Sequence, residues 1–101
     1  MTLRFRVTTK ARLDILDITR YTKRTWGKAA SDRYARAIDR RIRWLAEDPQ
    51  RGRSRDEIAP GYRSYPQGAH LVFYIVAGGE MVVIGVPHQA MDLHAKGDDL
   101  E

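Results

Sequence analysis

GAHLVFYIVAGGEMVVIGVPHQAMD, residues 68–92, is almost free of charge until its end, in a chain where 31% of the residues are charged. Two apolar runs, residues 70–76 and 81–87, flank the pair Gly78 and Gly79. Glycine accepts the positive φ that a type I′ turn needs at both central positions, so we predict an antiparallel hairpin here. Both faces of its strands are apolar, which predicts that both faces are covered.

Two more strands are predicted before this hairpin. LRFRV, residues 3–7, alternates apolar and basic side chains, as a strand with one buried face does. GYRSYPQG, residues 61–68, reads as a short strand that Pro66 and Gly68 bring to an end. Residues 50–60 carry helix breakers and charges without any period, so we expect a loop there.

Residues between these strands predict two helices. Helical spacing begins after Thr8 or Thr9, either of which can be the N-cap, and Gly27 is a plausible stop. The same period then resumes until Pro49 ends the second helix. On the first helix, the face expected to be buried holds Ala11, Ile15, Ile18, Thr22 and Trp26. On the second helix it holds Ala30, Tyr34, Ala37, Ile38, Trp44 and Leu45.

Together these elements predict an α+β fold in one domain over residues 1–101. An N-terminal strand, an antiparallel helical hairpin on one face of the sheet and a three-stranded antiparallel meander follow one another. The sheet would then present a second apolar face that the helices do not reach. We expect a second subunit or the chain of a binding partner to cover it. Alternatively, the N-terminal strand and the short, polar C-terminal tail fold over this face of the sheet.

Composition excludes several classes of site. The 101 residues include no cysteine, which rules out disulfides, a thiolate nucleophile and a Cys-based zinc site. The first residues lack the apolar core of a signal peptide, and no apolar run approaches a membrane span, so we expect a cytoplasmic protein without membrane contact. The net charge of +5 favours acidic proteins, nucleic acids or anionic surfaces as partners.

Both helices carry surface features that have two interpretations. Leu13 and Leu16 lie nearly opposite the buried stripe of the first helix, either as scattered surface leucines or as a partner contact. The second helix carries a basic ridge that is either a solvated face, partly neutralised by nearby acids, or an anion-binding surface. Its members are Arg33, Arg36, Arg40 and Arg43.

Few side chains could support catalysis. The candidates are Arg63, His70, Tyr74, His88, Asp92 and His94. No pair of histidines has the i, i+4 spacing of a helical metal site, and no glycine-rich phosphate loop is present, so we predict neither a metal nor a cofactor. His70 opens an apolar strand and His88 closes one, positions that favour a hydrogen-bonded edge residue over a catalyst.

The ordered motifs of residues 3–93 resemble the ParE branch of the RelE/ParE toxin superfamily. That family shows D-[IL]-x-x-I-x-x-Y, W-G, A-x-x-Y, L-A-x-x-P-x-x-G, G-Y-R-S, H-x-V-x-Y and H-Q-x-M-D in this order. The matching residues here are Asp14, Ile15, Ile18, Tyr21, Trp26, Gly27, Ala30, Tyr34, Leu45, Ala46, Pro49, Gly52, Gly61, Tyr62, Arg63, Ser64, His70, Val72, Tyr74, His88, Gln89, Met91 and Asp92.

This resemblance implies the toxin of a type II toxin-antitoxin module. It implies a ParD-like antitoxin as partner, whose disordered C-terminal segment wraps the toxin in a heteromeric complex, expected to be a heterotetramer or larger. Such a tail is usually acidic and apolar, which suits a chain of charge +5. The residues expected to bind it are Leu13, Leu16, Arg33, Arg36, Arg40, Tyr62, Arg63 and Tyr74.

Two activities are known in the superfamily, and the resemblance favours inhibition of DNA gyrase by trapping its cleaved complex with DNA. The alternative is a RelE-like, ribosome-dependent mRNA endoribonuclease using Arg63, Tyr74 and His88. Leu71 stands where those nucleases commonly carry an arginine that contacts the phosphate, which leaves the ribonuclease set incomplete. A third possibility is an inactive member that only binds its antitoxin. We expect no enzymatic activity, and no sequence-specific DNA binding by this chain alone.

The C-terminal segment is where the resemblance places the contact with the target. The residues expected to take part are His88, Gln89, Met91 and Asp92. Just before them the chain departs from the ParE pattern: Gly85 suggests a β-bulge and Pro87 removes a ladder donor. These two residues are expected to change how the segment is presented.

Overall fold

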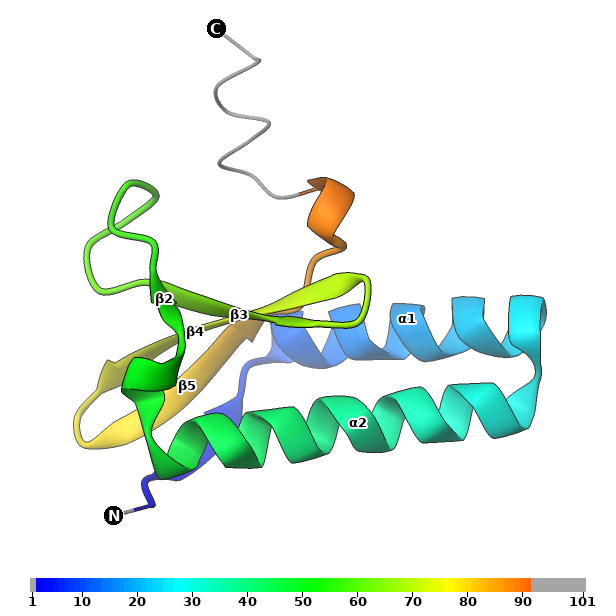
Figure 1. Cartoon of the computed structure of the whole chain (residues 1–101), viewed down its shortest axis with the longest axis horizontal. Coiled ribbons are helices and arrows are strands. Elements are labelled where there is room, and N and C mark those ends of the chain that lie inside the picture. The colour runs from blue at the N-terminus through cyan, green and yellow to red at the C-terminus, as the bar shows by residue number, and fades with distance from the viewer. Residues whose placement is uncertain (1, 92–101) are drawn as a thin grey trace, which may run out of the picture.

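The computed structural model describes residues 2–91. Two helices, α1 (Thr9–Trp26) and α2 (Lys28–Glu47), lie antiparallel and pack against one sheet (Figure 1). The sheet contains β1 (Arg4–Val7), β2 (Arg53–Ser54), β3 (Arg63–Gln67), β4 (His70–Ala77) and β5 (Glu80–Gly85). Two short 3-10 helices complete the order, η1 (Pro49–Arg51) after α2 and η2 (Gln89–Met91) after β5. The predicted α+β fold is confirmed.

Strand order in the sheet is β1-β5-β4-β3-β2. The meander β3-β4-β5 is antiparallel, as predicted, and β1 pairs with β5 in parallel, with Phe5 opposite Met81. Gly78 and Gly79 have φ of 61° and 74°, which confirms the turn predicted between β4 and β5. The strand β2 was missed, because it is only two residues long within a stretch of charged residues and breakers.

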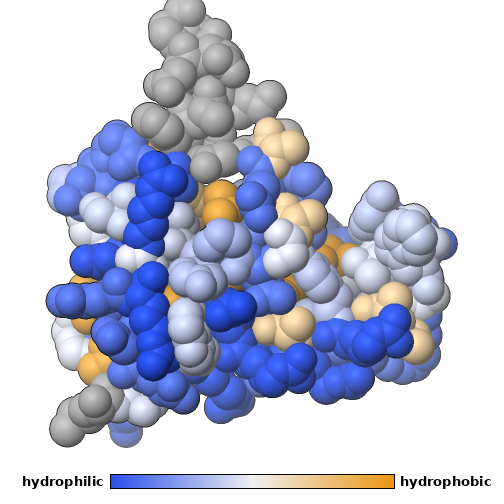
Figure 2. Space-filling model, in the orientation of Figure 1, coloured by the Kyte–Doolittle hydropathy of each residue, from blue (hydrophilic) through white to orange (hydrophobic). Residues whose placement is uncertain are grey.

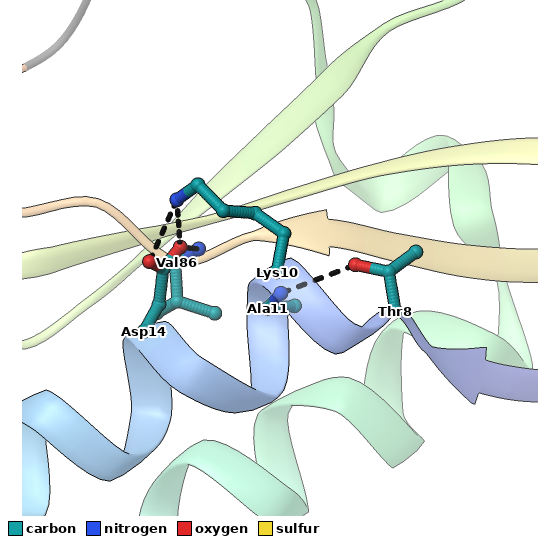
Figure 3. Close-up of polar contacts among 5 residues, drawn as sticks. All are labelled: Thr8, Lys10, Ala11, Asp14 and Val86. Atoms are coloured by element: carbon teal, nitrogen blue, oxygen red, sulfur yellow. Dashed lines mark hydrogen bonds and ion pairs between the residues drawn. The ribbon is translucent and has the colours of Figure 1, made fainter.

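The start of α1 is fixed by side-chain contacts (Figure 3). Thr8 is the N-cap, and its Oγ1 accepts a hydrogen bond from the backbone N–H of Ala11 at 3.1 Å. One turn further on, Asp14 accepts a hydrogen bond from the backbone N–H of Val86 at 2.9 Å and pairs with Lys10 at 2.6 Å. The capped helix is thereby tied to the residue that follows β5.

The core lies between the helices and the sheet. Its largest fully buried side chains are Tyr74, Ile38, Leu45, Met81, Val72, Val83 and Val86. Trp26 was predicted to be buried on the face of α1, and this prediction is wrong, since its side chain is 72% exposed. Trp26 ends α1 where the helical hairpin extends beyond the strands (Figure 1), so the helical period continues there without a sheet to pack against.

The face of the sheet opposite the helices is covered by the chain itself at several positions. Leu71, Phe73 and Val82 are 7%, 7% and 4% exposed. Arg55, from the segment between β2 and β3, is 3% exposed; its guanidinium carbon lies 5.1 Å from the centre of the Phe73 ring, and its Nη1 donates to Ser64 Oγ at 3.1 Å. The expectation that a partner must cover this face is therefore wrong for these residues. Neither helix has the length and apolar character needed to cross a membrane, as far as residues 2–91 are concerned.

Candidate functional site, an apolar cleft beside a tyrosine and two histidines

An open apolar cleft of about 580 Å³ lies between the helical hairpin and the end of the sheet where β4 begins. The residues that line it are Asp17, Ile18, Tyr21, Thr22, Trp26, Ala30, Tyr34, Ala69, His70 and His88. They come from α1, the first half of α2, the turn between β3 and β4, the start of β4 and the segment after β5. Tyr21 and Trp26 are 58% and 72% exposed, so two aromatic side chains stand in solvent at its rim.

Local contacts set the angle between the helices that wall this cleft. Gly27 links α1 to α2 with a φ of 95°, a backbone conformation that residues other than glycine rarely adopt. Ser31, which is buried, donates from Oγ to the backbone oxygen of Thr19 at 2.9 Å. This hydrogen bond fixes one helix against the other.

Tyr34, His70 and His88 form a polar cluster at the base of the cleft. The Tyr34 hydroxyl donates to the backbone oxygen of Gln67 at 2.7 Å and lies 2.7 Å from His70 Nδ1. Gly68 permits this approach, because a Cβ there would meet the Tyr34 hydroxyl at 2.5 Å. The cluster thus holds the turn between β3 and β4 against α2.

Burial sets the protonation of this cluster. It lowers the pKa of His70, with a further contribution from the neighbouring His88, and it raises the pKa of Tyr34. His70 and His88 form an isolated bridge with ring centres 5.1 Å apart, and His88 Nδ1 accepts from the backbone N–H of Ala90 at 3.0 Å. Both histidines are hydrogen-bonded, His70 as the first residue of β4 and His88 in the segment after β5. No group of three acidic or histidine side chains within residues 2–91 could hold a metal ion.

The three residues of the ribonuclease alternative are not brought together. Arg63 pairs with Tyr74 across β3 and β4, whereas His88 pairs with His70, four residues or about 13 Å further along β4. Arg63 Nη1 donates to the backbone oxygen of Gly52 at 2.7 Å, and the Tyr74 hydroxyl donates to the backbone oxygen of Pro49. These two side chains hold the segment around η1 to the sheet.

Tyr74 was also expected to contact the antitoxin, and the structure buries it. Its side chain is 0% exposed within the core cluster. The segment around η1 closes over the phenol, since a Cβ on Gly52 would overlap the Tyr74 hydroxyl. A partner could reach Tyr74 only if this segment moved away. Arg63 and Tyr62, by contrast, are half-buried and keep some accessible surface.

The other residues expected to bind the antitoxin lie at the surface. Leu13 and Leu16 are 54% and 41% exposed on α1. Figure 2 shows strongly hydrophilic side chains along α2, the helix that carries the basic ridge. Its exposed arginines among the predicted binding residues are Arg33, Arg36 and Arg40. These residues occupy the solvent sides of the helices, outside the cleft.

The C-terminal segment reaches the cleft at its first residues. His88 lines the cleft, and Gln89 is anchored to the turn between β3 and β4 through its backbone N–H to Ala69 and its side-chain Nε2 to Gly68, both at 2.7 Å. Met91 ends η2, and Asp92 lies outside the described residues. The predicted bulge is present: Phe73 pairs with Gly85 and Tyr74 with Val83, which leaves Ile84 as the extra residue of β5.

Sequence reasoning missed the aromatic rim of the cleft. Tyr21 was noted only as part of a motif, and Trp26 was placed in the core. The available signal was the glycine directly after Trp26, because a tight turn at the end of two long helices leaves its neighbours without packing partners.

Comparisons with known proteins agree with this architecture. The family model described as the ParE toxin of the type II toxin-antitoxin system parDE matches residues 5–93. The chain is 35% identical to Toxin ParE1 of Caulobacter vibrioides, over 90% of this chain and 94% of that protein. It is 36% identical to Toxin ParE1 of Mycobacterium tuberculosis, over 92% of this chain and 96% of that protein.

Two solved structures are similar to this one. A chain of the chromosomal ParDE toxin-antitoxin system of P. aeruginosa superposes with a TM-score of 0.76 at 18% identity, covering 86% of this chain and 96% of that one. A chain of the toxin-antitoxin complex RelBE2 of Mycobacterium tuberculosis gives a TM-score of 0.58 at 25% identity, covering 88% and 100%. The likeness to the first of them shows a shared fold.

Proposed function

This chain belongs to the ParE toxin family of type II toxin-antitoxin systems, and on that premise we propose that it acts by binding and not by catalysis. A ParD-like antitoxin neutralises it directly, and its target is DNA gyrase, whose cleaved complex with DNA it traps. The observation that carries the proposal is the apolar cleft with an exposed aromatic rim, which adjoins the segment implicated in target contact.

Exposed apolar surface supports antitoxin binding. Leu13, Leu16, Tyr21 and Trp26 leave between 41% and 72% of their side chains in solvent, all on α1. Large exposed side chains mark interaction sites when they adjoin a groove, as Tyr21 and Trp26 do, whereas Leu13 and Leu16 lie outside the cleft on the solvent side of α1. A tail that is disordered alone and both acidic and apolar would bury these side chains and meet a chain of net charge +5.

Two observations support a toxin without catalytic chemistry of its own. Leu71, at the position where the nucleases carry a phosphate-binding arginine, is 7% exposed and apolar, so it offers no cation to a phosphate. Arg63 and Tyr74 donate to backbone oxygens of the segment around η1, at the other end of β4 from His88. A proton shuttle and a phosphate contact would have to act within a few ångströms of one another.

The test is an assay of purified protein with DNA gyrase and plasmid. We expect loss of supercoiling and accumulation of cleaved DNA, and we expect both to disappear when the antitoxin encoded beside this gene is added first. Codon-dependent cuts of mRNA on ribosomes, with gyrase unaffected, would instead support the endoribonuclease alternative. If neither activity appears and the antitoxin still binds, the chain is a member that only binds its partner.

A further inference from the structure

A second cleft, of about 470 Å³, lies between α2 and β3 and contains an unusual arginine, Arg41. The guanidinium carbon of Arg41 lies 4.6 Å from the ring centre of Trp44 and 4.7 Å from that of Tyr65. The two rings pack edge to face, with centres 5.0 Å apart. The Arg41 Nε donates to the side-chain oxygen of Gln67 at 2.9 Å. Both the position and the orientation of the guanidinium are therefore fixed before any ligand arrives.

Arg41 has no anionic partner within residues 2–91. Carboxylates nearby are already in use: Asp39 pairs with Arg43 at 2.9 Å, and Glu47 pairs with Arg51 at 3.2 Å. Arg41 is half-buried, and its terminal amino groups donate to no acceptor in the part of the chain that the structure describes. A partly desolvated cation in a fixed fork geometry is a binding site for a carboxylate or a phosphate.

The surroundings of Arg41 favour a carboxylate on a polypeptide over a nucleic acid. The ring faces of Trp44 are occupied by guanidinium groups, since Arg51 lies 4.4 Å from its ring centre in addition to Arg41. Nucleic-acid bases would need such faces free for stacking.

We propose that Arg41 receives an acidic side chain of the antitoxin tail and sets the register of that tail on the toxin. This inference rests on the proposed function. Tyr34 lines the first cleft and Arg41 the second, seven residues apart on α2, or about 10 Å. Gln67 contacts both, through its backbone oxygen to Tyr34 and its side chain to Arg41. Tyr34 is the residue of α2 in the first cleft that is nearest Arg41, so an apolar anchor seated in that cleft is about 10 Å or more from the acid that Arg41 binds. This distance corresponds to at least about seven residues of a helix or three of a strand.

The receptor can be tested without the antitoxin. The chain has two tryptophans, so in a Trp26→Phe background Trp44 gives the single indole N–H signal in an NMR spectrum. Sodium acetate titrated against sodium chloride at constant ionic strength is expected to shift this signal saturably. The shift should persist in Arg53→Gln, which removes the same charge from exposed strand β2, and should vanish in Arg41→Gln.

Other outcomes of this titration would overturn either the proposal that Arg41 binds an anion or the proposal that this anion is a carboxylate. Equal shifts in all variants, or none in the parent, would overturn the assignment of a carboxylate site to Arg41. Tighter binding of inorganic phosphate and of a 20-nucleotide single strand than of acetate would assign the site to nucleic acid. Arg41→Lys keeps the charge but loses the planar guanidinium geometry, so we expect it to lose most of the acetate-induced shift. Its spectrum also shows whether the packing against Trp44 and Tyr65 tolerates a substitution at residue 41.

The register is tested on the complex with the antitoxin encoded beside this gene. Arg41→Gln is expected to raise the Kd about tenfold to a hundredfold, while Arg53→Gln changes it less than about threefold. Each acidic residue of the antitoxin tail is then replaced singly by its amide. We expect one of these replacements to weaken binding to the parent toxin but to leave the Kd for the Arg41→Gln variant unchanged. If the antitoxin binds both variants equally, the inference fails and the proposed function stands. If no antitoxin binds at all, the proposed function fails, and the acetate titration still decides whether Arg41 is an anion receptor.

Discussion

Asp14 and Val86 are 72 positions apart in the chain, and the carboxylate of Asp14 accepts the backbone N–H of Val86 at 2.9 Å (Figure 3). Val86 follows β5 and is 2% exposed, so its N–H has no access to water. A buried donor without a partner carries a large desolvation penalty. The contact therefore fixes where the segment containing His88 leaves the sheet.

Asp14→Ala should destabilise the protein by about 1–3 kcal/mol, because it leaves the Val86 N–H unsatisfied. Urea unfolding followed by circular dichroism measures the change. Asp17→Ala is the control, since Asp17 is exposed on the same helix and we expect a change within about 0.5 kcal/mol. Equal stability of the two variants would mean that the Asp14 contact does not hold the end of β5.

Tyr74→Phe separates a structural role of this residue from a catalytic one. The substitution removes the hydroxyl that donates to the backbone oxygen of Pro49 and should cost about 1 kcal/mol of unfolding free energy. Gyrase inhibition by the folded variant should be unchanged, and hydrogen exchange should accelerate at the amides of residues 51 and 52. Burial raises the pKa of Tyr74, which keeps the phenol protonated at neutral pH. Loss of ribosome-dependent mRNA cleavage in this variant, with unchanged stability, would instead argue for the ribonuclease alternative.

Local patterns predicted most of the fold. The two glycines between β4 and β5, the threonine that caps α1 and the proline that follows α2 each act through backbone conformations or hydrogen bonds within a few residues. The same locality explains the bulge predicted at Gly85. Each of these features can be predicted from neighbouring residues alone, without knowing what packs against the chain.

Positions that depend on distant packing could not be predicted in the same way. Tyr74 looks like a surface aromatic of an apolar strand, and only the fold shows that the segment around η1 closes over it. Arg55 lies in a charged stretch that suggests solvent, yet it covers Phe73 on the far face of the sheet. Trp26 continues a helical stripe past the point where the sheet ends. In each case a long-range contact, or its absence, overrides the local pattern.

Stability should fall as the pH is lowered through the range in which His70 titrates in the unfolded chain. Burial depresses the pKa of His70 below 6.5 in the folded protein, so around pH 6 the unfolded chain binds more protons than the folded one. The stabilisation is complete above about pH 6.5 and is lost as the pH falls toward the folded pKa. The groups that face His70 are Tyr34 from α2 and His88 from the segment after β5.

Urea unfolding at several pH values between 7.5 and 5 measures this effect. His70→Asn should flatten the pH dependence, because it removes the group whose protonation differs between the two states. His88→Gln should flatten it less, since burial and not the neighbouring His88 is the larger cause of the lowered pKa of His70. A His70→Asn variant that keeps the full slope of the parent would place the titration elsewhere in the chain.

The aromatic rim of the first cleft should contribute to antitoxin affinity with little effect on stability. Tyr21 and Trp26 are more than half exposed, so Tyr21→Ala and Trp26→Ala remove little packing from the folded toxin. A partner that buries them would lose large contact areas, and we expect the Kd for the antitoxin to rise at least about tenfold for Trp26→Ala. Val76→Ala is the matched control, because Val76 is an exposed apolar residue (48%) outside this cleft. Isothermal titration calorimetry measures the Kd, and thermal melting measures the stability. If the Trp26→Ala and Val76→Ala variants bind the antitoxin with equal affinity, the antitoxin binds at a surface other than this cleft.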